Sequence, residues 1–136
     1  MDKNGLTGFE ELTLQHRSDE FSDQFSTPAD PRFWIRIEKS FSGGVVISDM
    51  LFGDQDEYVA ANAVVQVLHA LNTPKPTEII FRNLGGVDAP ETVQTAQKVE
   101  RMVEAMVMRQ RRFIVGREYE TRREKVDLVF RFKHFD

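Results

Sequence analysis

Residues 54–71, DQDEYVAANAVVQVLHAL, form the clearest element that the sequence predicts. Apolar side chains recur there at the spacing of an amphipathic helix, which predicts a helix over about 55–71. These side chains are Ala60, Val64, Val67, Leu68 and Leu71. Asp54 and Glu57 have the spacing of a capping box, in which both side chains bind backbone amides of the first turn. Asn72 and Pro74 follow and end the helix.

Upstream of this helix, apolar and polar side chains alternate from Arg32, which is typical of a half-buried strand. Phe33, Ile35 and Ile37 share one face, whereas Trp34, Arg36 and Glu38 share the other. The turn sequence SFSGG at 40–44 leads to a second apolar run at 45–51. Together these segments predict a hairpin.

Downstream, residues 77–81 predict a third strand, which the glycine-containing sequence from Asn83 breaks. Asp88 and Glu91 repeat the capping-box spacing before a second helix that runs to about residue 110. Two further strands, 113–115 and 126–135, flank the polar segment 117–125, which we interpret as a hairpin arm. The order strand–strand–helix–strand–helix–strand–strand predicts an α/β fold, specifically an α+β two-layer sandwich. Its mixed sheet would carry both helices on one face.

Composition indicates one domain. The chain has 136 residues, no cysteine and a formal net charge of −4. Residues 1–31 contain seven acidic and two basic side chains and end in Pro28-Ala-Asp-Pro31, so we expect an acidic, partly disordered N-terminal arm. Residues 32–136 would form the single α/β domain. The first residues lack the apolar run of an export signal, and no run is long enough to span a bilayer, so we expect a cytoplasmic protein without a membrane partner.

The residue inventory argues against familiar catalytic and metal sites. Without cysteine there is no thiolate ligand or thiol nucleophile. His16, His69 and His134 fall in three different predicted elements, which does not match a histidine metal site. The acidic residues at 49–57 and the glycines at 85–86 are better explained by helix capping and a tight turn. We therefore predict no catalytic residue, no metal and no cofactor.

The most distinctive feature is a basic C-terminal region. Residues 101–136 contain ten basic and six acidic side chains. The candidate nucleic-acid-binding residues in it are Arg109, Arg111, Arg112, Arg117, Arg122, Arg123 and Lys125. A two-stranded ribbon that carries arginines is able to enter a nucleic-acid groove. Interleaved glutamates offer the other interpretation, in which the same arginines form ordinary ion pairs.

Residues 45–133 resemble the Alba family of small nucleic-acid-binding proteins. The likeness rests on VVIS (45–48) leading to YVAANAVVQVL (58–68), on TEIIFR (77–82) followed by ETVQTAQKVER (91–101), and on LVFRFK (128–133). The resemblance implies a dimer whose hairpin arms, here with Arg117, Arg122, Arg123 and Lys125, grip nucleic acid. It adds Arg82 at the glycine loop as a candidate contact. The first loop, 48–57, is acidic here, whereas family members usually place lysines there.

Three hypotheses follow. The first is a non-catalytic interaction or regulatory module, a homodimer that binds a protein partner through its sheet, arm or N-terminal segment. Its candidate contact residues are Phe9, Leu12, Phe21, Phe25 and Trp34. The alternative is an Alba-like RNA- or DNA-binding protein that uses the basic 117–125 hairpin arm. The second alternative is a small enzyme whose site cannot be assembled from the residue inventory.

Overall fold

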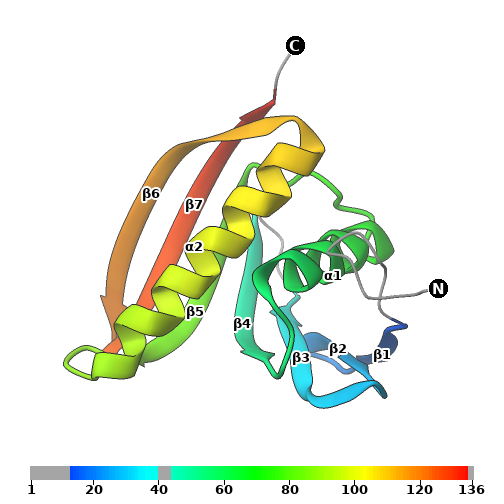
Figure 1. Cartoon of the computed structure of the whole chain (residues 1–136), viewed down its shortest axis with the longest axis horizontal. Helices are drawn as coiled ribbons and strands as arrows, with labels where there is room; N and C mark the ends of the chain where they lie inside the picture. The colour runs from blue at the N-terminus through cyan, green and yellow to red at the C-terminus, as the bar shows by residue number, and fades with distance from the viewer. Residues whose placement is uncertain (1–12, 40–43, 135–136) are drawn as a thin grey trace.

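The computed structural model describes residues 13–39 and 44–134. Within them, a seven-stranded mixed sheet and two helices form an α+β two-layer sandwich (Figure 1). The predicted fold class is therefore confirmed. The strands are β1 (Gln15–Ser18), β2 (Ser22–Thr27), β3 (Asp30–Glu38), β4 (Val45–Phe52), β5 (Glu78–Gly86), β6 (Arg112–Arg122) and β7 (Lys125–His134). The helices are α1 (Glu57–Ala70) and α2 (Pro90–Gln110).

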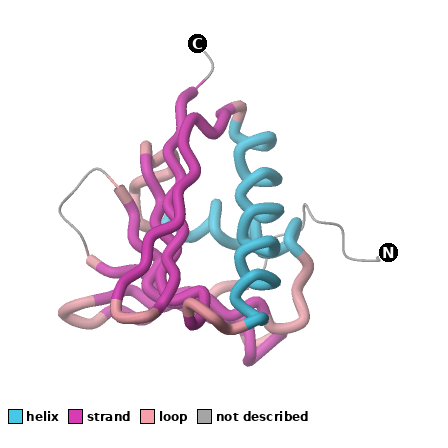
Figure 2. Tube along the Cα trace, turned by 90° about the vertical axis from the view of Figure 1, so that its left-hand side faces the viewer, coloured by secondary structure: helices cyan, strands magenta, loops and turns pink. Residues whose placement is uncertain are grey.

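The strand order across the sheet is β1-β2-β3-β4-β5-β7-β6. Neighbouring strands are antiparallel except for β4 and β5, which pair in parallel. Two parallel neighbours need a crossover connection, and α1 supplies it. Both helices lie on the same side of the curved sheet (Figure 2), so no described helix covers the opposite face, which we call the helix-free face.

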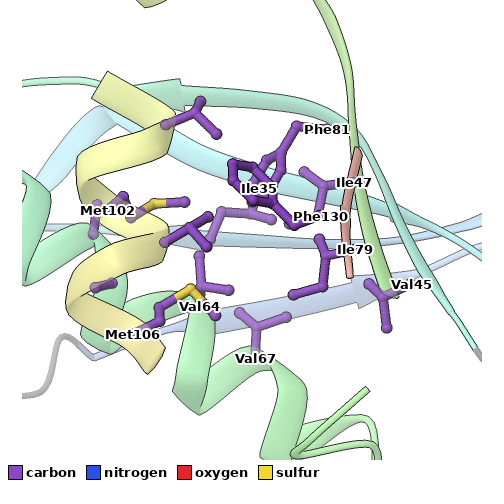
Figure 3. Packing of buried hydrophobic residues seen from close by; sticks show 14 of the residues in the cluster. Ile35, Val45, Ile47, Val64, Val67, Ile79, Phe81, Met102, Met106 and Phe130 are labelled. Atoms are coloured by element: carbon purple, nitrogen blue, oxygen red, sulfur yellow. The ribbon is translucent and has the colours of Figure 1, made fainter. Parts of the chain in front are cut away.

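The core fills the space between the sheet and the two helices (Figure 3). Phe81 of β5 and Phe130 of β7 meet edge to face there, with ring centroids 5.9 Å apart. Side chains of both layers supply the large, fully buried residues, as the amphipathic patterns predict. These residues are Phe33, Ile35, Ile47, Val64, Val67, Leu68, Ile79, Phe81, Met102, Met106, Leu128 and Phe130.

The predicted hairpin of β3 and β4 is confirmed. The strands pair antiparallel from Phe33 opposite Phe52 to Glu38 opposite Val46. The odd-numbered face of β3, from Phe33 to Ile37, is buried, and Glu38 on the other face is exposed. Residues 40–43 of the predicted turn lie outside the described part of the chain.

The N-terminal segment differs from the expected arm. β2 pairs with β3, and β1 pairs with β2, so both strands extend the sheet. The side chain of Phe25 is 2% exposed and belongs to the core. Pro28 lies in the tight β2–β3 turn, and Pro31 lies near the start of β3, where a missing backbone donor is tolerated. Residues 1–12 lie outside the described part of the chain.

Both predicted capping boxes are wrong, although both helices are present. The N-cap of α1 is Asp56, whose carboxylate accepts from the backbone amides of Tyr58 and Val59. The N-cap of α2 is Ala89, which makes no side-chain cap bond. Pro90 opens α2, and its missing N–H removes one amide that would otherwise need a partner.

β5 continues five residues beyond its predicted end, to Gly86. Asn83 and Gly85 have positive φ angles of 61° and 155°, and the β5–β7 register shifts between Phe81 and Gly85. The hydroxyl of Thr92 donates to the Gly86 carbonyl at 2.7 Å. A Cβ at Gly85 would lie 2.2 Å from that hydroxyl oxygen. Only glycine therefore fits where α2 begins against β5.

The predicted hairpin arm corresponds to the β6–β7 hairpin. The strands pair from Arg112 opposite His134 to Arg122 opposite Lys125, with a bulge between Ile114 and Gly116. The turn residues Arg123 and Glu124 have φ angles of 51° and 63°. Two successive positive φ angles are typical of a type I′ turn, whose twist matches that of the flanking strands.

Asp30 fixes the loop between β4 and α1. Its buried carboxylate accepts from the backbone amide of Asp54 at 2.6 Å and from Gln55 Nε2 at 2.9 Å. It also accepts from the backbone amide of Arg32 at 3.1 Å. These hydrogen bonds, with that from Asp54 first, lower the pKa of Asp30. Gly53 lies so close that a Cβ there would be 2.3 Å from Asp30 Oδ2.

We expect the variant Asp30→Asn to unfold at a lower temperature than the wild type at pH 7. The lowered pKa means that the ionised carboxylate stabilises the folded state above its unfolded pKa of about 3.9. This stabilisation is lost as the pH falls through the lower folded-state pKa. The difference in unfolding midpoint should therefore shrink below about pH 4. A difference that stays constant from pH 7 to pH 3 would contradict this role, and Asp54→Asn, an exposed carboxylate, is the control.

Candidate interaction surface

Arg117, at the centre of the predicted basic arm, is tied to α2. Its Nη1 lies 3.3 Å from Glu100 Oε1, and its Nη2 lies 4.0 Å from Glu104 Oε2. Its guanidinium carbon lies 5.7 Å from the ring centroid of Phe130. Both carboxylates belong to the helix that covers this face of the sheet. Arg117 therefore joins the two layers of the sandwich.

Arg82 and Arg122 converge on one carboxylate on the helix-free face of the sheet. Asp127 Oδ2 lies 3.5 Å from Arg82 Nη1 and 3.4 Å from Arg122 Nε. Asp127 Oδ1 accepts from the backbone amide of Asn83 at 3.0 Å. The Asp127 side chain is only 3% exposed. Both cations thus serve to neutralise a buried carboxylate.

Three arginines lie around the C-terminal end of α2. Arg112 is buried against the ring of Phe132, donates to the Pro76 carbonyl and to Gln110 Oε1, and has its pKa lowered by burial. Arg109 donates to the side-chain oxygen of Asn62 at 2.9 Å. Arg111 is the exposed C-cap, with a φ angle of 55°.

Arg123 and Lys125 complete the predicted set at the β6–β7 turn. Both are exposed, and no described carboxylate lies within ion-pair distance of either. The eight predicted basic residues therefore divide between the α2 side of β6, the Asp127 cluster, the end of α2 and the hairpin turn. The structure does not bring all eight together: among these groups only the Asp127 cluster and the hairpin turn adjoin, because Arg122 lies opposite Lys125.

The predicted partner-binding residues also separate. Phe25 is a core residue, so its assignment as a contact is corrected: it stacks on the His16 ring at 4.3 Å. Phe21 is 75% exposed at the β1–β2 turn. Trp34 is partly exposed on the helix-free face, 5.1 Å from the guanidinium of Arg36. Phe9 and Leu12 lie outside the described residues.

The helix-free face carries a series of ion pairs. Arg131 lies between Glu78 at 3.2 Å and Glu118 at 3.1 Å. Arg36 lies 3.8 Å from Asp49. Positive and negative side chains thus alternate across this face, and a phosphate backbone would have to compete with carboxylates for its arginines.

The outer edge of β6 is the surface that the sequence analysis missed. β6 has eleven residues and ends the strand order, so on its outer side no described strand pairs with it. Phe113, Val115 and Tyr119 are 38%, 50% and 53% exposed. The signal was present in the apolar run Phe113-Ile-Val115. This run predicts a strand over 113–115 only, because the polar segment 117–125 that follows is interpreted as a hairpin arm.

Tyr119 and Arg117 lie on the side of β6 that faces α2. Burial and the nearby Glu100 carboxylate raise the pKa of Tyr119. Farther along α2, an open groove of about 350 Å³ lies between the two helices. Its exposed apolar lining comes from Tyr58 of α1 and Met108 of α2. Arg101, which pairs with Glu57, and Glu104 also line it.

Within residues 13–39 and 44–134, no group of three or more histidine, aspartate or glutamate side chains is arranged to hold a metal ion. His16 instead pairs with Asp23, with Nε2 2.8 Å from Oδ1. No described helix is long and apolar enough to cross a membrane. No family model, curated protein or solved structure matches the chain, so the resemblance to the Alba family stays a prediction.

We expect Asp127→Asn to lower the free energy of unfolding by roughly 1–3 kcal/mol, because it leaves Arg82 and Arg122 without their shared charge partner. Arg122→Gln should cost less than about 1 kcal/mol, because this side chain is partly solvated. Urea unfolding of both variants measures the difference. Equal decreases in the free energy of unfolding would show that the buried Asp127 carboxylate is not the group that stabilises this cluster.

The pairing of the arginines also predicts weak nucleic-acid binding. Titrations of labelled single- and double-stranded RNA and DNA at physiological salt should show no dissociation constant below about 10⁻⁶ M, the tight end of non-specific binding. Tight, salt-sensitive binding would contradict this expectation. If the double variant Arg123→Ala, Lys125→Ala then weakened that binding, the hairpin turn would be identified as the contact.

Proposed function

We propose that the protein is a non-catalytic interaction module that binds an extended segment of a protein partner along the outer edge of β6. The observation that carries this proposal is the length and exposure of that edge. Eleven residues correspond to roughly 35 Å of strand, and the backbone donors and acceptors that point away from β7 pair with no described strand. Such an edge is a template for one more strand.

The two edges of the sheet differ. The other edge, β1, has four residues, all exposed, and short edge strands are a common protection against unwanted pairing. β6 is nearly three times as long and contains no proline. Its one bulge lies near the start, between Ile114 and Gly116. The regular stretch after this bulge is the part best suited to pair with a partner.

The side chains of β6 favour a polypeptide over nucleic acid. Tyr119 and Val115 supply amphipathic and apolar area, and aromatic residues are enriched at protein interfaces. Arg117 and Arg122 are already paired with carboxylates. Glu120 on the same strand has no ion-pair partner among the described residues, so it would repel phosphates but would pair with a cationic side chain of a protein.

A photo-crosslinking amino acid placed at one exposed aromatic position at a time tests the proposed edge. Tyr119 probes β6, Phe21 probes the β1–β2 turn and Tyr58 probes the helix groove, and all three side chains are more than half exposed. In cells that produce the protein, we expect a defined crosslinked species from position 119 and none from positions 21 and 58.

The same crosslink should disappear when Val115→Lys is added, because a charged residue on an open edge opposes strand addition. Circular dichroism of this variant checks that it remains folded. Crosslinking from position 21 or 58 but not from 119 would contradict the assignment of β6. The partner would then contact the β1–β2 turn or the groove between the helices instead of β6.

A further inference from the structure

We infer that the strand that pairs with β6 is β6 of a second copy of this chain, antiparallel and centred on Glu118. This inference rests on the proposed function of the β6 edge. A symmetric dimer of this kind uses the same patch on both copies, so the side chains of β6 must complement themselves. One register makes the strand complementary to itself, through Arg117, Glu118 and Tyr119.

Symmetry restricts the possible registers. The two-fold axis that relates two antiparallel copies of β6 is perpendicular to the joined sheet. It passes midway between one residue of β6 and the same residue of the second copy. Residues at equal distances on either side of the axis then face each other. The Ile114–Gly116 bulge limits the regular part of the strand to residues 116–122, so only an axis at Glu118, Tyr119 or Glu120 pairs five or more of these residues.

Two of these three registers place the Glu120 carboxylate, which has no ion-pair partner among the described residues, opposite another carboxylate. An axis at Tyr119 places Glu118 opposite Glu120 twice. An axis at Glu120 joins two carboxylates that have no ion-pair partner among the described residues. Like charges directly opposite each other destabilise a strand pair.

The axis at Glu118 avoids this cost and adds a favourable contact. Each Glu118 carboxylate is bound by Arg131 Nη1 at 3.1 Å, so the charges that meet at the axis are already neutralised. Glu120 falls opposite Gly116, which has no side chain to repel it. Arg117 falls opposite Tyr119 of the second copy, and this pair occurs twice.

The contact between Arg117 and Tyr119 fits the surroundings of both groups. Arg117 is held by Glu100 and Glu104 and lies 5.7 Å from the Phe130 ring, so its position is fixed before pairing. Tyr119 is 53% exposed beside it on the same face of the strand. In the dimer, each phenol ring would contact the guanidinium of the other copy, a cation–π contact that gains strength as water is excluded.

Single cysteines test the register, because the natural chain contains none. With the axis at Glu118, the two Cα atoms at position 118 would be about 4.5–5.5 Å apart, within the range of a disulfide. The two Cα atoms at position 120 would be roughly 13 Å apart, which is too far. Light scattering of the full-length wild type should give a mass of twice 15.7 kDa.

Under mild oxidation, we therefore expect Glu118→Cys to form a covalent dimer and Glu120→Cys, an exposed neighbour on the same face, to stay unlinked. A second pair of variants tests the side-chain contact. Tyr119→Arg should raise the dissociation constant of the dimer at least about tenfold, because it places two cations opposite each other twice. Tyr58→Arg, at an exposed tyrosine of α1, should leave it unchanged.

A wild-type chain that remains monomeric at high concentration would overturn the inference. So would a disulfide from position 120 but not from position 118. Neither result removes the proposed function, because photo-crosslinking from position 119 would then identify a different protein on β6. If position 119 gave no crosslink of any kind, the proposed function itself would fail.

Discussion

The parallel pairing of β4 with β5 holds the two halves of the sheet together. It consists of three residue pairs, in which Val45, Val46 and Ile47 lie opposite Ile79, Ile80 and Phe81. On one side of this joint, each strand from β4 to β1 is antiparallel to its neighbour, and on the other side the same holds for each strand from β5 to β6. Figure 3 shows Val64 and Val67 of α1 projecting into the core toward Ile79 of β5, so the crossover helix covers the joint. Without this apolar strip, each half would expose a strand edge and half of the core.

Several arginines also stabilise this sheet and its core. Arg112 and Arg117 lie over the rings of Phe132 and Phe130, so their aliphatic stems and planar groups cover core aromatics. Arg82 and Arg122 neutralise Asp127, whose buried carboxylate also receives the amide of Asn83 at the bend of β5. A buried carboxylate without these partners would be costly. The positive charge that suggests nucleic-acid binding in the sequence is therefore largely committed within the fold.

Hydrophobic periodicity was enough to predict α1, α2, the β3–β4 hairpin and β7, because each has a continuous apolar face. It predicts β6 only over 113–115, because the rest of that strand is polar. It failed for β1 and β2, where the buried face of β2 contains Asp23 and Thr27 beside Phe25. Capping was misassigned because Asp54 and Asp56 both precede α1, and spacing alone does not show that Asp30 binds the Asp54 amide. The arginine roles could not be predicted, because the carboxylates that bind them can lie far away in the chain, as Asp127 lies 45 residues from Arg82.

The charges on β6 limit which strands can pair with its outer edge. A long edge strand with only apolar side chains would pair with almost any extended segment, and natural proteins restrict such edges with charges. Among the described residues, the charges on the regular part of β6 are bound within their own chain except for Glu120: Arg117 by Glu100, Glu118 by Arg131 and Arg122 by Asp127. A strand that places another charge at these positions gains little from a group that is already neutralised. The Glu120 carboxylate has no such partner. An incoming strand must therefore place a cation or a residue without a side chain opposite it, or leave the carboxylate in contact with solvent. The edge therefore admits few sequences and registers, and the exposed Tyr119 beside Glu120 provides the binding area for those that fit.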